Sequence, residues 1–143
     1  MCGRYGFIPG SKKDFPVSGF FEWQKTNGAK QPYFIKFKNE EMFSFAGLYD
    51  TWTDAEGKVL NTYTIITTGS NDLLTPIHNR MPVILDKTAE DKWLSIDTQS
   101  NELMQILKPF ADSHLTAYPI SPAVNKPEND TAEIIQPQEQ IHF

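Results

Sequence analysis

The sequence predicts one α+β domain, made mainly of antiparallel strands that curl toward a barrel, with a few short peripheral helices. Short segments that alternate apolar and polar residues, rich in aromatic and β-branched side chains, fill the first half of the chain. Helix signals occur only after about residue 70, and a polar, proline-rich tail begins at about residue 121. No repeat or linker divides the 143 residues, a length that fits one domain.

The predicted strands are short and are bounded by turn residues. Within 17–24, alternation puts Ser18, Phe20 and Glu22 on one face and Phe21 and Trp23 on the other. The pair Asn-Gly at 27–28 is a strong signal for a hairpin turn. The full set of predicted strands is 2–8, 17–24, 33–38, 42–52, 60–68, 81–85 and 115–120.

Three helices are predicted in the second half of the chain. A short one is expected after the possible cap at 70–72, ending near Pro76. A second begins at Thr88, where Thr-x-x-Asp resembles a capping box, and buries Trp93. The third spans 101–110 and has an apolar face.

The net charge of −5 argues against bulk electrostatic capture of nucleic acid, although a local basic groove is compatible with it. No apolar run is long enough to span a membrane, and the N-terminus has no signal-peptide pattern. A single cysteine excludes an internal disulfide and favours a reducing compartment. We therefore expect a cytoplasmic protein, and nothing in the sequence indicates more than a monomer.

The single cysteine, Cys2, is the candidate reactive centre. A lone cysteine is usually a small buried hydrophobe, but its position changes that expectation. Removal of Met1 would leave an α-amine and a thiol on adjacent carbons. The amine is partly neutral near pH 7 and could form a Schiff base with an aldehyde, which the thiol could close to a thiazolidine. Alternatively, the thiolate could attack an acyl carbon.

Two further residues are candidates for proton transfer. If Glu22 faces inward with Phe20, desolvation would raise its pKa and suit it to acid–base chemistry; a solvent-facing strand residue is the alternative. His78 lies two residues before Arg80, and Arg80 and Arg4 are the two arginines of the chain. A histidine beside an anion-binding group suits proton transfer, and a purely structural histidine is the alternative. The scattered His and Cys residues have no metal-ligand spacing, so we predict no metal and no cofactor.

Several motifs, taken in order, resemble the SOS response-associated peptidase (SRAP) family over residues 1 to about 127. They are Met-Cys-Gly-Arg-Tyr at 1–5, Gly-Phe-Ile-Pro at 6–9, Gly-Phe-Phe-Glu-Trp at 19–23, Phe-Ala-Gly-Leu-Tyr-Asp-Thr-Trp at 45–52, Ile-Ile-Thr-Thr at 65–68 and Ile-His-Asn-Arg-Met-Pro-Val-Ile at 77–84. The resemblance implies a barrel-like fold that binds single-stranded DNA, and a mature N-terminal cysteine that crosslinks to abasic sites.

By motif position, the resemblance also implies roles for single residues. Cys2 would be the crosslinking residue, Glu22 the glutamate that assists Schiff-base chemistry and Met1 removal, and His78 a proton-transfer group. Arg4 and Arg80 would contact phosphates. The remaining implied DNA contacts are Trp23, Asn71 and Pro82.

The sequence departs from the family between its first motif and Gly-Phe-Phe-Glu-Trp. The family has an Asn-Ala-Arg-x-Glu segment there, and residues 5–19 are too few to contain it. Either the sequence omits this segment or the protein is a shortened member. Met1, while attached, blocks the α-amine of Cys2.

Two other functions remain open from the sequence. One is a cysteine peptidase that acts on other proteins, with Cys2 as nucleophile and His78 as base. The other is a non-catalytic binder of single-stranded DNA that stacks bases on Trp23 or Trp52.

Overall fold

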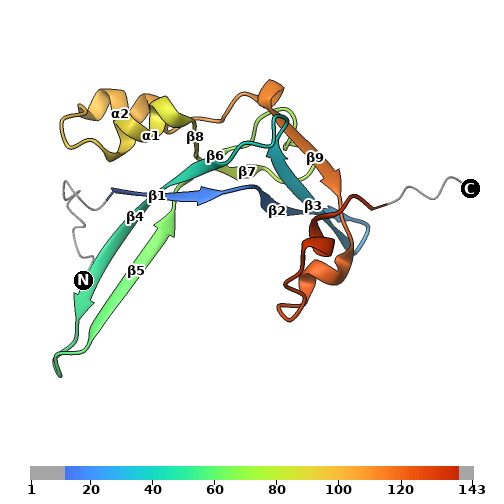
Figure 1. Cartoon of the computed structure of the whole chain (residues 1–143), viewed down its shortest axis with the longest axis horizontal. Helices are drawn as coiled ribbons and strands as arrows, with labels where there is room; N and C mark the ends of the chain where they lie inside the picture. Colours follow the sequence, from blue (N-terminus) through green and yellow to red (C-terminus); the bar gives the residue numbers. More distant parts are fainter. Residues whose placement is uncertain (1–11, 139–143) are drawn as a thin grey trace, which may run out of the picture.

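The strands form three antiparallel sheets in a computed structural model that describes residues 12–138 (Figure 1). The first sheet contains β1 (Lys12–Val17), β4 (Phe43–Thr53), β5 (Val59–Ile65) and the short β8 (Ile84–Leu85). The second contains β2 (Phe20–Thr26), β3 (Ala29–Phe37) and β9 (Leu115–Pro119). The third pairs β6 (Thr67–Gly69) with β7 (Arg80–Pro82). The predicted α+β class with mainly antiparallel strands is confirmed, and the described strands do not close into a barrel.

The predicted strand 17–24 is two strands in two different sheets. β1 ends at Val17 and pairs with β4, whereas β2 begins at Phe20 and pairs with β3. The break lies at Gly19, where a Cβ atom would come within 2.3 Å of the Phe34 ring and 2.7 Å of the Ile35 carbonyl oxygen. Only glycine allows this close approach, so the chain changes sheets here.

The predicted strands 60–68 and 81–85 are each interrupted by one residue that joins two sheets. Ile66 donates its backbone N–H to the carbonyl of Ala46 and accepts a bond from the N–H of Val83, both at 2.9 Å. Val83 in turn accepts a bond from the N–H of Ala46 at 2.9 Å. These bonds hold the third sheet against the first.

Two α-helices cover one side of the first sheet. α1 (Lys87–Leu94) begins one residue earlier than expected, because Asp86, rather than Thr88, caps it by accepting a bond from the Ala89 N–H at 2.8 Å. α2 (Ser100–Ile106) ends four residues before the predicted end. The helix expected to end near Pro76 is absent from the described structure, which has consecutive turns there. A helix would need an N–H at Pro76, which proline lacks.

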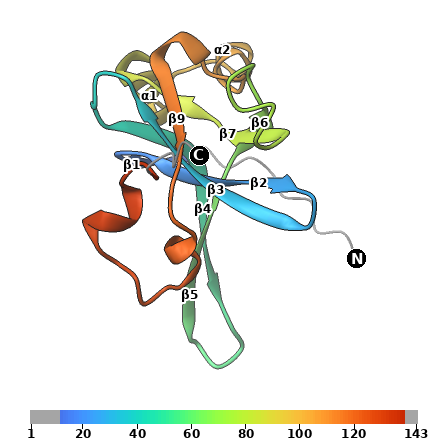
Figure 2. The ribbon, with the colours of Figure 1, turned by 90° about the vertical axis from the view of Figure 1, so that its right-hand side faces the viewer.

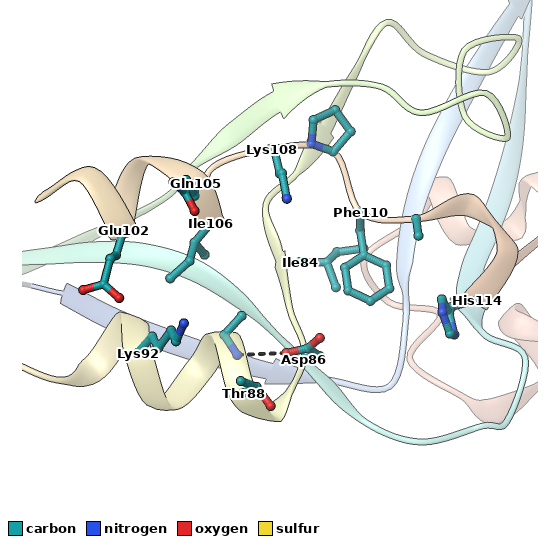
Figure 3. Close-up of a pocket in the computed structure, with 13 residues that line it drawn as sticks. Ile84, Asp86, Thr88, Lys92, Glu102, Gln105, Ile106, Lys108, Phe110 and His114 are labelled. Carbon is teal, nitrogen blue, oxygen red and sulfur yellow. Dashed lines mark hydrogen bonds between the residues drawn. The ribbon is translucent and has the colours of Figure 1, made fainter. Parts of the chain in front are cut away.

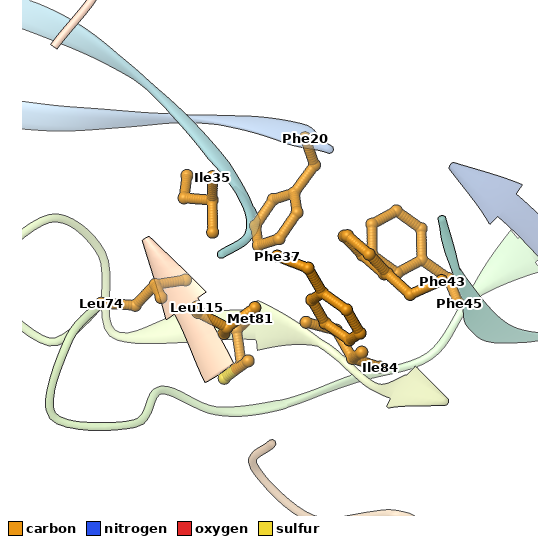
Figure 4. Packing of buried hydrophobic residues seen from close by; sticks show 9 residues of the cluster. All are labelled: Phe20, Ile35, Phe37, Phe43, Phe45, Leu74, Met81, Ile84 and Leu115. Atoms are coloured by element: carbon orange, nitrogen blue, oxygen red, sulfur yellow. The ribbon is translucent and has the colours of Figure 1, made fainter. Parts of the chain in front are cut away.

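Buried side chains form two hydrophobic clusters. The larger one fills the space between the sheets and is centred on aromatic rings, with Phe37 stacked on Phe43 at 4.5 Å between ring centroids (Figure 4). The smaller one lies beneath the helices and contains Trp93, whose indole N–H donates to the Lys13 carbonyl at 3.0 Å. From residue 121 to residue 138 the chain is irregular apart from short 3-10 turns.

The outer halves of β4 and β5 project from the body as a two-stranded arm (Figures 1 and 2). We define the arm as residues 49–65. All seven side chains of β5 are exposed. Tyr49 in the arm is 45% exposed, and its cross-strand neighbour Tyr63 packs against Phe15 of β1, with 5.0 Å between their ring centroids.

Candidate functional site

Glu22 lies on β2, next to the larger hydrophobic cluster. It is paired in register with Tyr33 of β3 and follows the buried Phe20 on the same face of the strand. Its side chain is 20% exposed. The inward orientation considered from the sequence is therefore the one the structure has.

His78 lies at the end of the loop 70–79, which the larger cluster anchors. Leu74 is fully buried, and its carbonyl accepts bonds at 2.8 Å from the backbone N–H groups of both Ile77 and His78. The loop is also fixed to β2, because the Gln24 side-chain amide donates to the Pro76 carbonyl at 2.9 Å. These bonds place His78 beside β2.

The structure brings Glu22 and His78 together, with 3.6 Å between Glu22 Oε2 and His78 Nδ1. This separation is too long for a hydrogen bond but short enough for strong electrostatic interaction. Burial raises the pKa of the Glu22 carboxyl above its ordinary value, and the charge of His78 and a backbone bond from Trp23 partly oppose that rise. Because both side chains are partly exposed, the pair can hold a proton or exchange one with solvent.

The backbone of Arg80 contacts the Nδ1 atom of His78. The Arg80 carbonyl oxygen lies 3.1 Å from Nδ1, and the Arg80 backbone nitrogen lies 3.4 Å from the same atom. The carbonyl accepts a bond only from a protonated Nδ1, whereas the N–H donates only to an unprotonated one, so the tautomer decides which contact is a hydrogen bond. The His78 side chain is 44% exposed.

Arg80 and Pro82 lie on β7, the strand that follows His78. The Arg80 guanidinium donates through Nη2 to the carbonyl and the hydroxyl of Thr67, each at 2.8 Å. Arg80 is exposed, and its backbone rather than its guanidinium contacts His78. Pro82 is half-buried opposite Thr67.

Trp23 and Asn71 each have partners within the protein. The Trp23 indole N–H donates to the side chain of Asn125 at 2.8 Å. Asn71 donates to the Phe110 carbonyl at 2.9 Å, and its side-chain oxygen accepts from the Leu74 N–H at 3.0 Å. Asn71 therefore shapes the loop that carries His78, and its bond from the Leu74 N–H is the kind of capping contact that the possible cap at 70–72 would make.

Cys2 and Arg4, together with the predicted strand 2–8, lie outside the described residues. Gln24 and Thr67 contribute to the site and were not identified from the sequence. Both make contacts with residues distant in the sequence, which no local pattern reveals. The one sequence feature that could have indicated them is their position, since Gln24 follows the motif at 19–23 and Thr67 lies within the motif at 65–68. Among residues 12–138 no group of three or more His, Cys, Asp or Glu side chains is placed to hold a metal.

A cavity of about 450 Å³ lies elsewhere. It lies between the two helices and the segment 108–114, and its lining includes Ile84, Lys92, Lys108, Phe110 and His114 (Figure 3). It contains none of the predicted site residues. In the part of the chain that the structure describes, no helix is long and apolar enough to cross a membrane.

The structure is thus that of an α+β protein in which a glutamate on a strand lies beside a histidine on a loop. The family model "SOS response associated peptidase (SRAP)" matches residues 8–127. The chain therefore belongs to the SRAP family, as its motifs predicted.

Named relatives and solved structures agree with this assignment. "Abasic site processing protein YoqW" of Bacillus subtilis is 42% identical over 123 residues, covering 85% of this chain and 55% of the relative. "Abasic site processing protein HMCES" of Gallus gallus is 37% identical, covering 86% of this chain and 42% of the relative. A crystal structure of a Bacteroides thetaiotaomicron protein superposes with a TM-score of 0.82 at 38% identity, covering 92% of this chain and 59% of the other. The chain spans about half the length of the curated relatives it matches.

Proposed function

We propose that this chain processes abasic sites in single-stranded DNA by forming a covalent crosslink through Cys2. The observation that carries the proposal is the Glu22–His78 pair, with its 3.6 Å separation and a Glu22 carboxyl whose pKa is raised by burial. Relatives named as abasic site processing proteins support the same substrate.

The reaction joins an aminothiol to an aldehyde. The neutral α-amine of Cys2 attacks the aldehyde of the ring-opened abasic sugar, and loss of water gives a Schiff base. The thiol then adds across the C=N bond, its proton passes to nitrogen, and a thiazolidine ring closes. One C–N and one C–S bond form, and the aldehyde oxygen leaves as water. Glu22 would protonate the leaving hydroxyl, and His78 would move a proton during sugar ring opening.

Met1 must be removed before this chemistry can begin. With Met1 attached, the Cys2 nitrogen is an amide and cannot form a Schiff base. We propose that removal is autoproteolytic, with Cys2 as nucleophile and Glu22 assisting. This step would be the hydrolase, thiol-peptidase activity of the protein.

The proposed partner is single-stranded DNA that carries an abasic site. Arg80 lies close to His78 and is exposed, as a phosphate contact requires, and Arg4, Trp23, Asn71 and Pro82 stay predicted contacts. Such a function would place the protein at the nucleoid in the cytoplasm of a bacterium. The monomer expected from the sequence stays a prediction.

The test is incubation of Met1-processed protein with a single-stranded oligonucleotide that contains one abasic site, followed by denaturing electrophoresis. We expect a slower band that requires both the abasic site and Cys2, and that disappears when methoxyamine first caps the aldehyde. An adduct that persists in Cys2→Ala, or no adduct with processed wild-type protein, would overturn the proposal.

A further inference from the structure

Two lysines face each other across the β2–β3 hairpin. Lys25 of β2 is paired in register with Lys30 of β3, and both residues are exposed. Like charges directly opposite each other destabilise a ladder. Among the ladders that the structure describes, this is the one pair with the same charge on both strands. Neither lysine takes part in the ion pairs found within residues 12–138, so no carboxylate there offsets the repulsion.

The register brings the two lysine side chains close together. The carbonyl of Pro32 accepts a bond at 3.0 Å from the N–H of Ile120, on the side of β9. Pro32 therefore makes no ladder bond to Trp23, its partner in β2, because both backbone groups of a strand residue point to the same side. Such non-hydrogen-bonded pairs alternate with hydrogen-bonded ones, so the Lys25–Lys30 pair, two positions along, is of the same kind. This is the kind in which side chains approach most closely, with about 5 Å between Cβ atoms.

The lysine pair lies on the same face of the hairpin as an aromatic ring. Residues two apart in a strand share a face, so Lys25 and Lys30 lie on the face that carries Trp23. The Trp23 ring is fixed in place, because its N–H donates to the Asn125 side chain at 2.8 Å. Cations next to an aromatic ring are the combination with which proteins hold single-stranded nucleic acid.

The pair is also close to the candidate site along the same strand. Lys25 follows Glu22 by three residues, which corresponds to about 10 Å at the rise of a β-strand. Alternation puts the two side chains on opposite faces. In the described structure β2 is the outer strand of its sheet, and the turn of its hairpin lies at the periphery of the molecule (Figure 2). A polymer held at Glu22 can therefore pass around the end of the hairpin and reach the lysines.

We propose that Lys25 and Lys30 together hold one backbone phosphate of the single-stranded DNA, a few nucleotides from the abasic site, an inference that rests on the proposed function. A phosphate between the two ammonium groups replaces their mutual repulsion by attraction to a common anion. The chain as a whole has a net charge of −5, so an anionic polymer needs local cations of this kind. The Trp23 ring on the same face favours a nucleic acid over an acidic polypeptide, because bases stack on aromatic rings.

Binding of a labelled, intact single-stranded oligonucleotide to the whole chain, followed by fluorescence anisotropy over a salt series, tests the proposal. The double variant Lys25→Gln, Lys30→Gln should raise the Kd at least about fivefold at low salt and reduce the slope of log K against log salt by about 0.7. The matched control is Lys92→Gln, Lys108→Gln, which removes two positive charges beside the cavity of Figure 3. Its Kd and slope should stay close to those of wild type.

Thermal unfolding without DNA gives a second, independent readout. Lys30→Glu replaces a like-charge pair by an opposite-charge pair, so its Tm should rise, most clearly at low salt, while its binding of single-stranded DNA weakens. A lysine that serves only the fold would not show these opposite effects.

Several results would overturn the proposal. They are a lower Tm in Lys30→Glu, unchanged DNA binding in the Lys25→Gln, Lys30→Gln variant, and an equal loss of binding in the control. Loss of binding to a labelled polyglutamate peptide, with DNA binding unchanged, would assign the lysines to a polypeptide instead. Wild-type protein that binds the intact strand but forms no crosslink would overturn the proposed function alone, because this assay needs no abasic site.

Discussion

Glu22 Oε2 and His78 Nδ1 lie 3.6 Å apart, although the two residues come from a strand and a loop that are distant in the sequence. Glu22 has its position from the β2–β3 ladder, and His78 has its position from the buried Leu74 and the bond between Gln24 and Pro76. The pair is thus held by β2 and by the loop 70–79, which the Gln24–Pro76 bond joins. Its chemistry depends on both.

We predict that Glu22→Gln stabilises the protein at neutral pH. The folded state raises the pKa of Glu22 above its ordinary 4.5 through desolvation. Protonated Glu22 therefore favours folding below pH 4.5, and this contribution is lost as the pH rises through the folded-state pKa. Gln mimics the protonated form, so the Tm of the variant should exceed that of wild type at neutral pH. The difference should shrink as the pH falls below 4.5. A variant less stable than wild type at neutral pH would show instead that the charge of His78 outweighs burial.

We predict that Gln24 positions the His78 loop through its amide N–H. Gln24→Glu keeps the size of the side chain but removes the donor to the Pro76 carbonyl, at a cost of about 0.5–1.5 kcal/mol. If the proposed function holds, single-turnover crosslinking at saturating single-stranded DNA should slow several-fold.

The control for this prediction is Tyr33→Phe. It removes only the hydroxyl that donates to Gln24 Oε1 at 3.3 Å and leaves the bond to Pro76 in place. Its crosslinking rate should stay close to that of wild type. Equal rates in Gln24→Glu and wild type would contradict a positioning role for Gln24.

Local pattern predicted much of the fold. Alternation in 17–24 correctly placed Phe20 and Glu22 on one face, and the Asn-Gly pair correctly predicted the β2–β3 hairpin. The same pattern predicts a single strand over 17–24, and this prediction is wrong. The break at Gly19 arises because a Cβ there would clash with Phe34 and Ile35, which lie in another strand. Breaks of this kind depend on tertiary contacts that no local window contains.

The candidate site was predictable by residue but not by geometry. The surroundings and motifs of Glu22 and His78 indicate each residue as a candidate, but no local pattern indicates that the two face each other. Asn71 was predicted as a DNA contact, and its side chain proves to be bonded to Phe110 and Leu74. The exposure of Tyr49 was not predictable, because aromatic content does not reveal whether a strand is covered.

We predict that Arg80 makes one phosphate contact. Arg80→Ala should weaken binding of single-stranded DNA to a similar extent for all sequences, and should reduce the slope of log K against log salt by about 0.7. Binding measured by fluorescence anisotropy over a salt series gives both quantities. Lys87→Ala is the matched control, because it removes one positive charge from a side chain already paired with Glu90 and Asp91. Identical slopes in the two variants would contradict a specific contact by Arg80.

We predict that Gly19→Ala strongly destabilises the fold. The added Cβ would lie 2.3 Å from Phe34 Cζ and 2.7 Å from the Ile35 carbonyl oxygen, and the backbone atom cannot move without disturbing the β2–β3 ladder. We expect a loss of about 1–3 kcal/mol in the free energy of unfolding, measured by urea denaturation. The matched control is Gly69→Ala, since a Cβ at Gly69 meets no atom within 4 Å. Its free energy of unfolding should stay within about 0.5 kcal/mol of wild type. If the two variants unfold at the same urea concentration, the close approach of Gly19 to β3 is not the reason that the chain passes from the first sheet to the second at this residue.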